Sequence, residues 1–521
     1  MTDNQAAVTV GDVPAGRKRE VLIVLPGLLL TLIIAMLDQL VVSTALPRIV
    51  GDLGGLNHLA WVVTAYILAA TITTLFYGKL GDMYGRKRFL MIAIVLFLIG
   101  SALSGLAHSM DQLIAFRALQ GLGAGGLMVG AIATIGDMVS PRERGQYMGY
   151  MMAAMMLAMI AGPLVGGYIT QNWSWRWIFY INMPIGGAAL IYLWLTLHLP
   201  RRRVEHRIDY LGALVIAVFS TAIVLLTSWG GSQYAWGSWE ILMLAVVSAL
   251  ALVLFFVVER RAVEPMLPLH VFKNRNFSVA SSMSLLLGVA MLGTLTFIPL
   301  YQQTVQHASP TVSGLMLIPL MLGSTVTSLI SGQVTSRTGR YKILPIIGGA
   351  IMTVGIYLLT HLSVNTTRLT SALCFVVLGI GMGFLMQITS LIVQNSVPQR
   401  DMGVASSSRA FFQQIGGSLG VSLFGVIFVK RFAEVMAVRL PGQHVVGGSQ
   451  TLNPATINSL PPTVREAAFQ SISHAIVGVF WWTIPVTLGV FLLALLVKEI
   501  PLRGRIEPVG EQASATPEMV H

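Results

Sequence analysis

A short basic turn between two long apolar runs constrains this fold more than any other stretch of the sequence. Gly78–Arg88 contains four cations and three glycines, and it separates the apolar runs Trp61–Tyr77 and Phe89–Ala107. A run of roughly 20 apolar residues is long enough to cross a bilayer as a helix. The turn is therefore expected to join two membrane-spanning helices, and its cations predict that it faces the cytoplasm.

A weaker copy of this basic turn occurs later in the chain. Gly332–Arg340 also lies between two apolar runs and also ends in a glycine followed by an arginine. The two turns begin 254 residues apart (332 − 78). Related turns at this separation predict a protein built from two similar halves, as many transporters are.

Composition and charge exclude two broad classes of protein. Hydrophobic residues make up 55% of the chain and charged residues only 10%, which excludes a soluble domain. The net charge of +12 could suggest a nucleic-acid partner. However, most of the cations fall in loops predicted to face one side, and that bias sets membrane orientation. These loops contain Arg17–Arg19, Arg86–Arg88, Arg142, Arg144, Arg201–Arg203, Arg260, Arg261, Arg337–Lys342, Arg503 and Arg505. We expect no nucleic-acid partner.

The apolar runs predict an all-α polytopic membrane protein. A window of roughly 20 residues finds about fourteen spans. An even count places both termini in the cytoplasm. The predicted fold is two six-helix bundles related by pseudo-twofold symmetry, plus two inserted transmembrane helices. The spans lie near residues 21–46, 60–77, 89–108, 112–136, 145–169, 177–199, 210–229, 239–258, 278–301, 312–333, 343–361, 370–396, 404–429 and 474–497.

These spans divide the chain into five predicted parts. They are a cytoplasmic N-terminal tail over 1–20, an N-terminal six-helix bundle over 21–199, a linker with two extra transmembrane helices over 200–270, a C-terminal six-helix bundle over 271–500, and a cytoplasmic C-terminal tail over 501–521. The largest outer loop is expected over 430–473, within the C-terminal bundle.

Asp38 is the one carboxylate that lies well inside a predicted span. The other 20 of the 21 Asp and Glu residues lie almost entirely in loops or near span ends. A charged carboxylate within the membrane is costly, so Asp38 is a candidate to take up a proton near neutral pH. The alternative interpretation is a carboxylate that only accepts hydrogen bonds between helices.

Arg117 is the clearest cation inside a span, and its predicted depth is comparable to that of Asp38. If spans 1 and 4 are neighbours, its guanidinium would stabilise ionised Asp38, and protonation of Asp38 would release the pair. Together the two residues would form a switch. The alternative is an arginine that extends to the outer headgroups. Arg409, near the inner end of its span, is more easily explained by such snorkelling.

Glycines and polar residues within the spans give further candidates. Gly162, Pro163, Gly166 and Gly167 predict a close, kinked helix contact that could act as a hinge, although a lone G-x-x-x-G usually means packing only. A second G-x-x-x-G lies at Gly121–Gly125. Candidate substrate-binding residues are Tyr66, Gln120, Met152, Met156, Tyr301, Gln302, Gln387 and Gln413.

Cysteine and histidine patterns indicate neither a metal site nor a disulfide. The single cysteine, Cys374, lies in an apolar run and is interpreted as a packing residue. The ten histidines show no helical pairing that resembles a metal site. We expect no metal, no cofactor other than the proton gradient, and no catalytic residues.

At these residues the chain resembles the major facilitator superfamily, specifically its fourteen-span drug:proton antiporter family. Gly78–Arg88 is similar to the superfamily's inner loop motif, and the resemblance implies that Gly78, Asp82, Gly85 and Arg86 form an inner-side conformational latch. Arg117–Gly123 is similar to the span 4 motif, whose arginine is tied to proton coupling. Gly162–Gly167 is similar to the antiporter motif of span 5.

Two further stretches, Leu37–Pro47 and Trp175–Gly186, resemble patterns of the fourteen-span branch. Leu40, Ser43 and Met83 depart from the residues that relatives often carry, which bears on specificity and not on the fold.

The sequence predicts a proton-driven exporter of lipophilic, cationic compounds that works by alternating access in a bacterial plasma membrane. Its partners would be small substrates, protons and membrane lipids, and it would not require oligomerisation. One alternative is a dedicated exporter of a single metabolite or self-made antibiotic on the same machinery. A membrane sensor or enzyme is the distant alternative, since no catalytic constellation and no large soluble domain are evident.

Overall fold

The computed structural model describes residues 15–53, 59–139, 141–198, 209–231, 233–262, 265, 267, 269–308, 310–398, 401–439 and 462–501. Residues 440–461 of the predicted outer loop lie outside this part of the chain, and so do residues 200–208 of the predicted linker. Side chains at a few helical positions, including Met156 and Pro163, also lie outside the described part.

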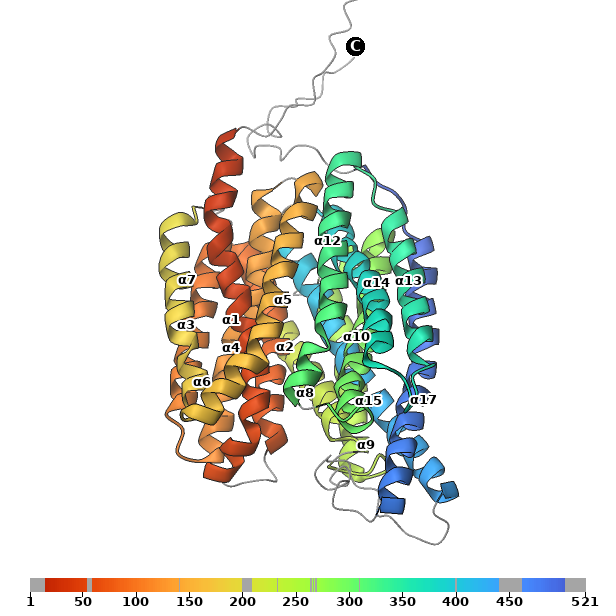
Figure 1. Ribbon diagram of the computed structural model, residues 1–521. Coiled ribbons are helices and arrows are strands. Elements are labelled where there is room, and N and C mark those ends of the chain that lie inside the picture. The colour runs from red at the N-terminus through yellow and green to blue at the C-terminus, as the bar shows by residue number, and fades with distance from the viewer. Residues whose placement is uncertain are drawn as a thin grey trace, which may run out of the picture.

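The described chain forms two groups of helices with a helical pair between them (Figure 1). The first group is α1 (Ala15–Leu53), α2 (Leu59–Tyr84), α3 (Arg86–Gly105), α4 (Met110–Met138), α5 (Pro141–Asn172), α6 (Trp177–Tyr180) and α7 (Asn182–Thr196). The pair is α8 (Tyr210–Trp229) and α9 (Trp239–Arg261), followed by the 3-10 helix η2 (Leu269–Lys273). The second group is α10 (Arg275–Thr304), α11 (Pro310–Leu315), α12 (Ile318–Thr338), α13 (Ile343–Leu359), α14 (Arg368–Asn395), α15 (Met402–Arg439) and α17 (Pro462–Leu495).

The two basic turns end their helices in a related way. Gly85, between α2 and α3, has φ +102°, and Gly339, at the end of α12, has φ +70°. Side chains other than glycine rarely adopt positive φ. Each turn therefore needs its glycine where one helix stops and the next begins.

The internal packing of the two groups follows one pattern. In the first group α1 packs on α5, and α4 packs on both α2 and α3. In the second group α10 packs on α15, and α14 packs on both α12 and α13. The second group has its own apolar core, separate from the cores of the first. This repeated pairing is what a pseudo-twofold relation between two halves requires.

The contacts between the halves obey the same symmetry. α5 of the first half crosses α12 of the second, and α15 of the second half crosses α2 of the first. Both crossings involve glycines of the two basic turns: Gly78 faces Ser407 and Gly403, while Gly332 faces Gly145. The residues that the sequence marks as repeated are thus the residues at which the halves meet.

The α8–α9 pair lies against the junction of the two halves. An apolar cluster joins α8 and α9 to Leu75 of α2 and to Phe411 of α15. Near the end of α8, Trp229 contacts Trp61 of α2, with ring centroids 5.2 Å apart, and Thr227 hydrogen-bonds to Ser418 of α15. The pair therefore touches both halves at once.

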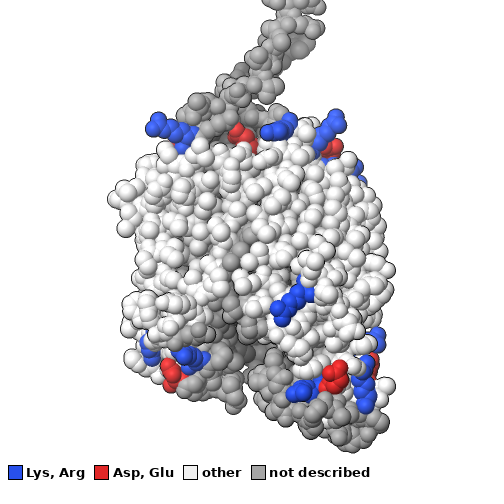
Figure 2. All heavy atoms as spheres, in the orientation of Figure 1, with Lys and Arg blue, Asp and Glu red and all other residues white. Residues whose placement is uncertain are grey.

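Length and composition support a protein that crosses the membrane many times. Among the described residues, 12 helical stretches are long and apolar enough to span a bilayer, and Ile343–Leu359 is a shorter apolar helix. α15 is a further long helix that packs between α2 and α10. Figure 2 shows, on one face, a broad band of other residues between charged groups at both ends, interrupted by a basic side chain. The count of fourteen spans stays a prediction.

The beginning of α1 and the last described residues both lie at the upper end of the bundle in Figure 1. We refer to this as the terminal end and to the other as the opposite end. The placement of the terminal end in the cytoplasm is a prediction from the basic turns.

The interpretation of Cys374 as a packing residue is confirmed, because its side chain is buried in the core of the second half. The interpretation of Arg409 as a snorkelling residue is wrong. It is buried in α15 and donates a hydrogen bond to Gln413 Oε1 over 2.9 Å. The side of α15 that carries Arg409 faces protein, which the apolar sequence around it did not reveal.

Candidate functional site

Asp38 and Arg117 form an ion pair inside the first half. Arg117 Nη1 of α4 lies 2.6 Å from Asp38 Oδ2 of α1, and the two side chains are 1% and 0% exposed. A pair this deeply buried is sustained only when its remaining polar atoms are also satisfied. The alternative of a lipid-facing Arg117 is excluded by this burial.

Two amide side chains complete the surroundings of the carboxylate. Gln120, one turn after Arg117, donates from Nε2 to Asp38 Oδ1 over 2.8 Å and accepts from Arg117 Nη1 over 2.7 Å. Asn182, the first residue of α7, donates from Nδ2 to Asp38 Oδ1 over 2.7 Å. Both amides are 0% exposed. The carboxylate therefore accepts from three N–H groups on two different helices.

An outer layer of contacts ties this cluster to three more helices. Asn182 Nδ2 also donates to Ser101 Oγ of α3 over 3.0 Å, and Ser101 in turn donates to the Phe179 carbonyl of α6 over 2.9 Å. The Arg117 guanidinium lies 4.1 Å from the centroid of the Tyr66 ring of α2, a cation–π contact. Asp38, Arg117, Gln120, Asn182 and Ser101 are called the Asp38 cluster below.

Glycines allow the helices to come close enough to build the cluster. A Cβ at Gly100 of α3 would overlap the Gln120 backbone of α4. A Cβ at Gly121 would overlap the Tyr66 carbonyl, and one at Gly125 the Ala70 carbonyl, both on α2. The packing interpretation of the G-x-x-x-G at Gly121–Gly125 is thus confirmed, and its effect is to place Tyr66 and Gln120 beside the ion pair.

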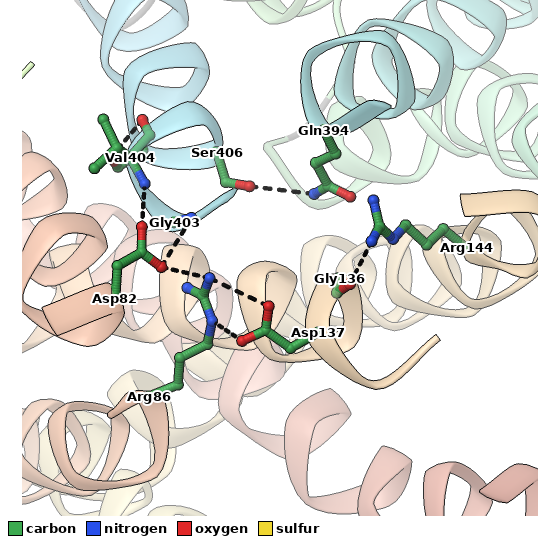
Figure 3. Close-up of polar contacts among 10 residues, drawn as sticks. Asp82, Arg86, Gly136, Asp137, Arg144, Gln394, Gly403, Val404 and Ser406 are labelled. Carbon is green, nitrogen blue, oxygen red and sulfur yellow. Dashed lines mark hydrogen bonds and ion pairs between the residues drawn. The ribbon is translucent and has the colours of Figure 1, made fainter. Parts of the chain in front are cut away.

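The basic turn joins the two halves at the terminal end (Figure 3). Asp82 of α2 accepts from the backbone N–H of Gly403 over 3.1 Å and of Val404 over 2.8 Å. These N–H groups belong to the first turn of α15, where backbone N–H groups have no acceptor within the helix and the helix dipole favours a negative charge. Arg86 pairs with Asp82 and also with Asp137 at the end of α4.

A second set of polar contacts lies beside this one. Arg144 of α5 donates to the Gly136 and Val139 carbonyls and so satisfies the last carbonyls of α4. Gln394 of α14 donates to Ser406 of α15 over 3.2 Å (Figure 3). Gln387 of α14 donates to the Gly145 carbonyl of α5 over 2.9 Å, which links the halves at the α5–α12 crossing.

We expect Asp82→Asn to lower turnover by about tenfold and to leave substrate affinity unchanged. An amide loses the charge that faces both the α15 N-terminus and Arg86, and hydrogen bonds to charged groups are worth about 1.5–3 kcal/mol. Gly85→Val should have the same effect through backbone strain at φ +102°. Transport rates and binding to the purified protein measure the two quantities. Glu434→Gln, at a half-exposed ion pair of α15, is the control. Weakened binding with normal conformational exchange would contradict a latch role.

The predicted hinge lies where α5 packs on α1. A Cβ at Gly162 would come within 2.6 Å of Leu40 Cβ, two residues beyond Asp38. The Gly166 carbonyl accepts a hydrogen bond from Thr170, whereas a Cβ at Gly167 would meet no described atom within 4 Å. The side chain of Pro163 lies outside the described residues. Gly162 therefore allows the close approach of α5 to α1 at this motif.

The predicted substrate-binding residues fall in several places. Tyr66 and Gln120 join the Asp38 cluster, Gln387 lies at the α5–α12 crossing, and Gln413 accepts from Arg409. Met152 packs beside the core of the first half, and the side chain of Met156 lies outside the described residues.

The remaining two candidates are engaged within the second half. Tyr301 is fully buried and donates to the Ser363 carbonyl over 2.8 Å. Gln302 accepts from Ser313 over 2.7 Å.

Sequence reasoning did not assign a role to Asn182, Ser101 or Asp137. Asn182 was visible as the only amide in the apolar stretch Trp177–Thr196, and a polar residue in such a stretch is itself a signal. Ser101 gave no signal, because a single serine is common in a span. Asp137 directly follows predicted span 4 and falls among the carboxylates expected in loops or near span ends.

Two related halves of spanning helices, with a buried ionisable cluster inside the first half, define a membrane transporter of the two-bundle type. The chain belongs to the Major Facilitator Superfamily, whose sequence profile matches residues 28–209 and 205–421. The solved structures support the same fold. The human organic anion transporter MFSD10 aligns with a TM-score of 0.58 at 12% identity, covering 91% of this chain and 100% of that one. The proton:xylose symporter XylE aligns with a TM-score of 0.57 at 13% identity, covering 89% and 96%.

Sequence relatives are transporters as well. An uncharacterized MFS-type transporter of Mycobacterium tuberculosis is 40% identical over 92% of this chain and 70% of its own length. Multidrug resistance protein 3 of Bacillus subtilis is 33% identical over 94% of this chain and 97% of its own length. The acurin A biosynthesis cluster MFS-type transporter of Aspergillus aculeatus is 32% identical over 86% and 79%. The family and fold are those of transporters and not of enzymes.

Proposed function

We propose that this protein is a proton-coupled antiporter that exports lipophilic, cationic compounds across a bacterial plasma membrane by alternating access. The observation that carries the proposal is the fully buried Asp38–Arg117 pair within the first half. A buried acid in a membrane protein is a functional site by default, and a carboxylate that can be neutralised is suited to carry a proton. The name of the Bacillus subtilis relative, Multidrug resistance protein 3, supports export of drugs as the substrate class.

In this proposal the proton acts on the ion pair. Protonation of Asp38 removes its charge, so Arg117 loses its main electrostatic partner while remaining buried. Leaving one charge of a buried pair without its partner is unfavourable by several kcal/mol. The protein can relieve that cost by rearranging α1 against α4, which changes access to the space between the halves.

The contacts at the terminal end supply the second element of the cycle. Asp82 and the Gly145–Gly332 crossing hold the halves together at the end predicted to face the cytoplasm. In the proposed cycle these contacts form when that side is shut and separate when substrate enters from the cell. The α8–α9 pair, which touches both halves, would move with them.

The test is uptake of a fluorescent lipophilic monocation into inverted membrane vesicles with a pH gradient imposed. The wild type should accumulate the compound, and Asp38→Asn should not, because asparagine permanently mimics the neutral acid. Substrate binding to purified Asp38→Asn should persist. The control is Asp111→Asn, at the exposed start of α4. Normal gradient-driven uptake by Asp38→Asn would refute Asp38 as the proton site.

A dedicated metabolite exporter on the same machinery is the second candidate. It is favoured by the relative from the acurin A biosynthesis cluster. A growth panel of chemically unrelated toxic compounds separates the two candidates. Protection against many compounds favours multidrug export, and protection against a single compound favours the dedicated exporter.

A further inference from the structure

The donors around Asp38 suit only one of its protonation states. Arg117, Gln120 and Asn182 all point N–H groups at the carboxylate oxygens. An ionised carboxylate accepts hydrogen bonds and donates none, so the arrangement fits the charged form. A protonated Asp38 carries an O–H that needs an acceptor. One neighbour must therefore turn an acceptor toward it.

Asn182 is the neighbour whose acceptor atom is not already engaged. Arg117 has no acceptor atom, and the Oε1 atom of Gln120 already accepts from Arg117 over 2.7 Å. Asn182 Oδ1 is buried and has no hydrogen-bond partner among the described residues. Rotating the Asn182 amide therefore breaks no bond at Oδ1. The bonds that change are those of Nδ2, to Asp38 and to Ser101.

We propose that Asn182 is the positioning residue that reads the protonation state of Asp38, donating to the carboxylate and accepting from the carboxylic acid. The inference rests on the proposed function, in which Asp38 takes up the transported proton. A proton from the aqueous phase binds Asp38 Oδ1 and cancels the negative charge. The Asn182 amide then rotates by half a turn, and the Nδ2–H to Oδ1 hydrogen bond is replaced by one from the Asp38 O–H to Asn182 Oδ1. No covalent bond other than the new O–H is made or broken.

The rotation of the Asn182 amide also changes the hydrogen bonds near the break between α6 and α7. Asn182 is the first residue of α7, and Ile181 separates it from α6. In the ionised state Ser101 accepts from Asn182 and donates to the Phe179 carbonyl. After rotation Ser101 faces the Asn182 carbonyl oxygen and donates to that atom instead. The Phe179 carbonyl loses the hydrogen bond from Ser101, so one contact between α6 and α3 is lost when Asp38 is protonated.

The other titratable groups near the Asp38 cluster can be distinguished from Asp38. Arg117 from α4 and the Tyr66 phenol from α2 are the charged and titratable side chains that face the Asp38 cluster in the described structure. α3, α6 and α7 contribute a hydroxyl, a carbonyl and an amide, and α5 approaches α1 through Gly162. Arginine and tyrosine ordinarily titrate far above neutral pH. A protonation change at this site that Asp38→Asn abolishes therefore reports Asp38.

Infrared difference spectroscopy on the full-length protein in lipid, recorded while the pH is changed, tests the inference. The carbonyl stretch of a protonated carboxyl group is its signature, and Asp38→Asn identifies the Asp38 band by abolishing it. Asn182→Leu keeps the side-chain size but removes the amide. We expect it to raise the band frequency, because the acid loses its acceptor.

Matched variants distinguish this role from simple packing. Ser101→Ala leaves both groups of Asn182 in place and should change the band frequency much less. Asn182→Gln keeps an amide and should bring the band part of the way back to its wild-type frequency. Asn182→Ala carries the same expectation as Asn182→Leu and keeps the test available if leucine does not pack.

The outcomes separate the inference from the proposed function. A normal Asp38 band at unchanged frequency in Asn182→Leu and Asn182→Ala overturns the role of Asn182 and leaves the proton site intact. Absence of any Asp38 band in the wild type across the pH range overturns the proton site itself.

Discussion

Arg117→Met is expected to lower the free energy of unfolding by about 3–5 kcal/mol. The substitution leaves the Asp38 carboxylate buried at 0% exposure without its charged partner, and breaking a buried pair from one side carries a cost of that size. Methionine keeps an unbranched side chain of similar length, so the packing against Tyr66 is largely retained. Thermal and denaturant unfolding of the purified protein measure the loss.

The double variant Asp38→Asn with Arg117→Met is the decisive comparison. It removes both charges, so most of the stability should return even though transport stays abolished. Arg431→Met is the matched control, because Arg431 pairs with Glu434 at about half exposure and exposed pairs contribute about 0–1 kcal/mol. Equal losses in Arg117→Met and the double variant would mean that packing, and not the charge pair, stabilises this site.

Gly332→Ala is expected to reduce the population with a closed terminal end by about fivefold to a hundredfold. A Cβ at Gly332 would overlap the Gly145 carbonyl across the α5–α12 crossing. Both sides of the contact are backbone, so no flexible side chain can move aside, and overpacking costs about 1–3 kcal/mol. Spin labels at the exposed positions Tyr150 and Val334 would report the separation of α5 from α12.

The control for this prediction uses the same substitution on another helix. A Cβ at Gly425 of α15 would meet no described atom within 4 Å, so Gly425→Ala should leave the distance distribution and transport unchanged. It should also be slightly stabilising, because alanine is a better helix former than glycine. An unchanged α5–α12 distance in Gly332→Ala would show that this crossing does not hold the terminal end closed.

The elements of the site that the sequence revealed are those with a local signature. Asp38 and Arg117 stand out because a charge within an apolar run is costly wherever the run folds. The two basic turns were recognisable because each joins two spans and needs a glycine at its helix boundary. Gly121–Gly125 was recognisable because its spacing puts two small residues on one helical face. The fold class followed from the same apolar runs.

What only the tertiary structure decided depends on which helix faces meet. Asn182 could be seen as a polar residue in a span, but its bond to Asp38 joins positions 144 residues apart and requires the break between α6 and α7. Asp82 could be assigned to a latch by resemblance, but its partners are backbone N–H groups at the start of α15, which no side-chain pattern marks.

Arg409 and the α8–α9 pair show the same division between what the sequence determines and what the tertiary structure determines. The sequence by itself determined that these segments are apolar helices, because helix formation and burial in a membrane are local consequences of composition. It could not determine that Arg409 faces protein, or that α8 lies between α2 and α15. In lipid an apolar surface can face either lipid or another helix at similar cost, so the hydrophobic pattern does not encode the neighbours. Close packing and a few hydrogen bonds choose them, and those exist only once the helices have assembled.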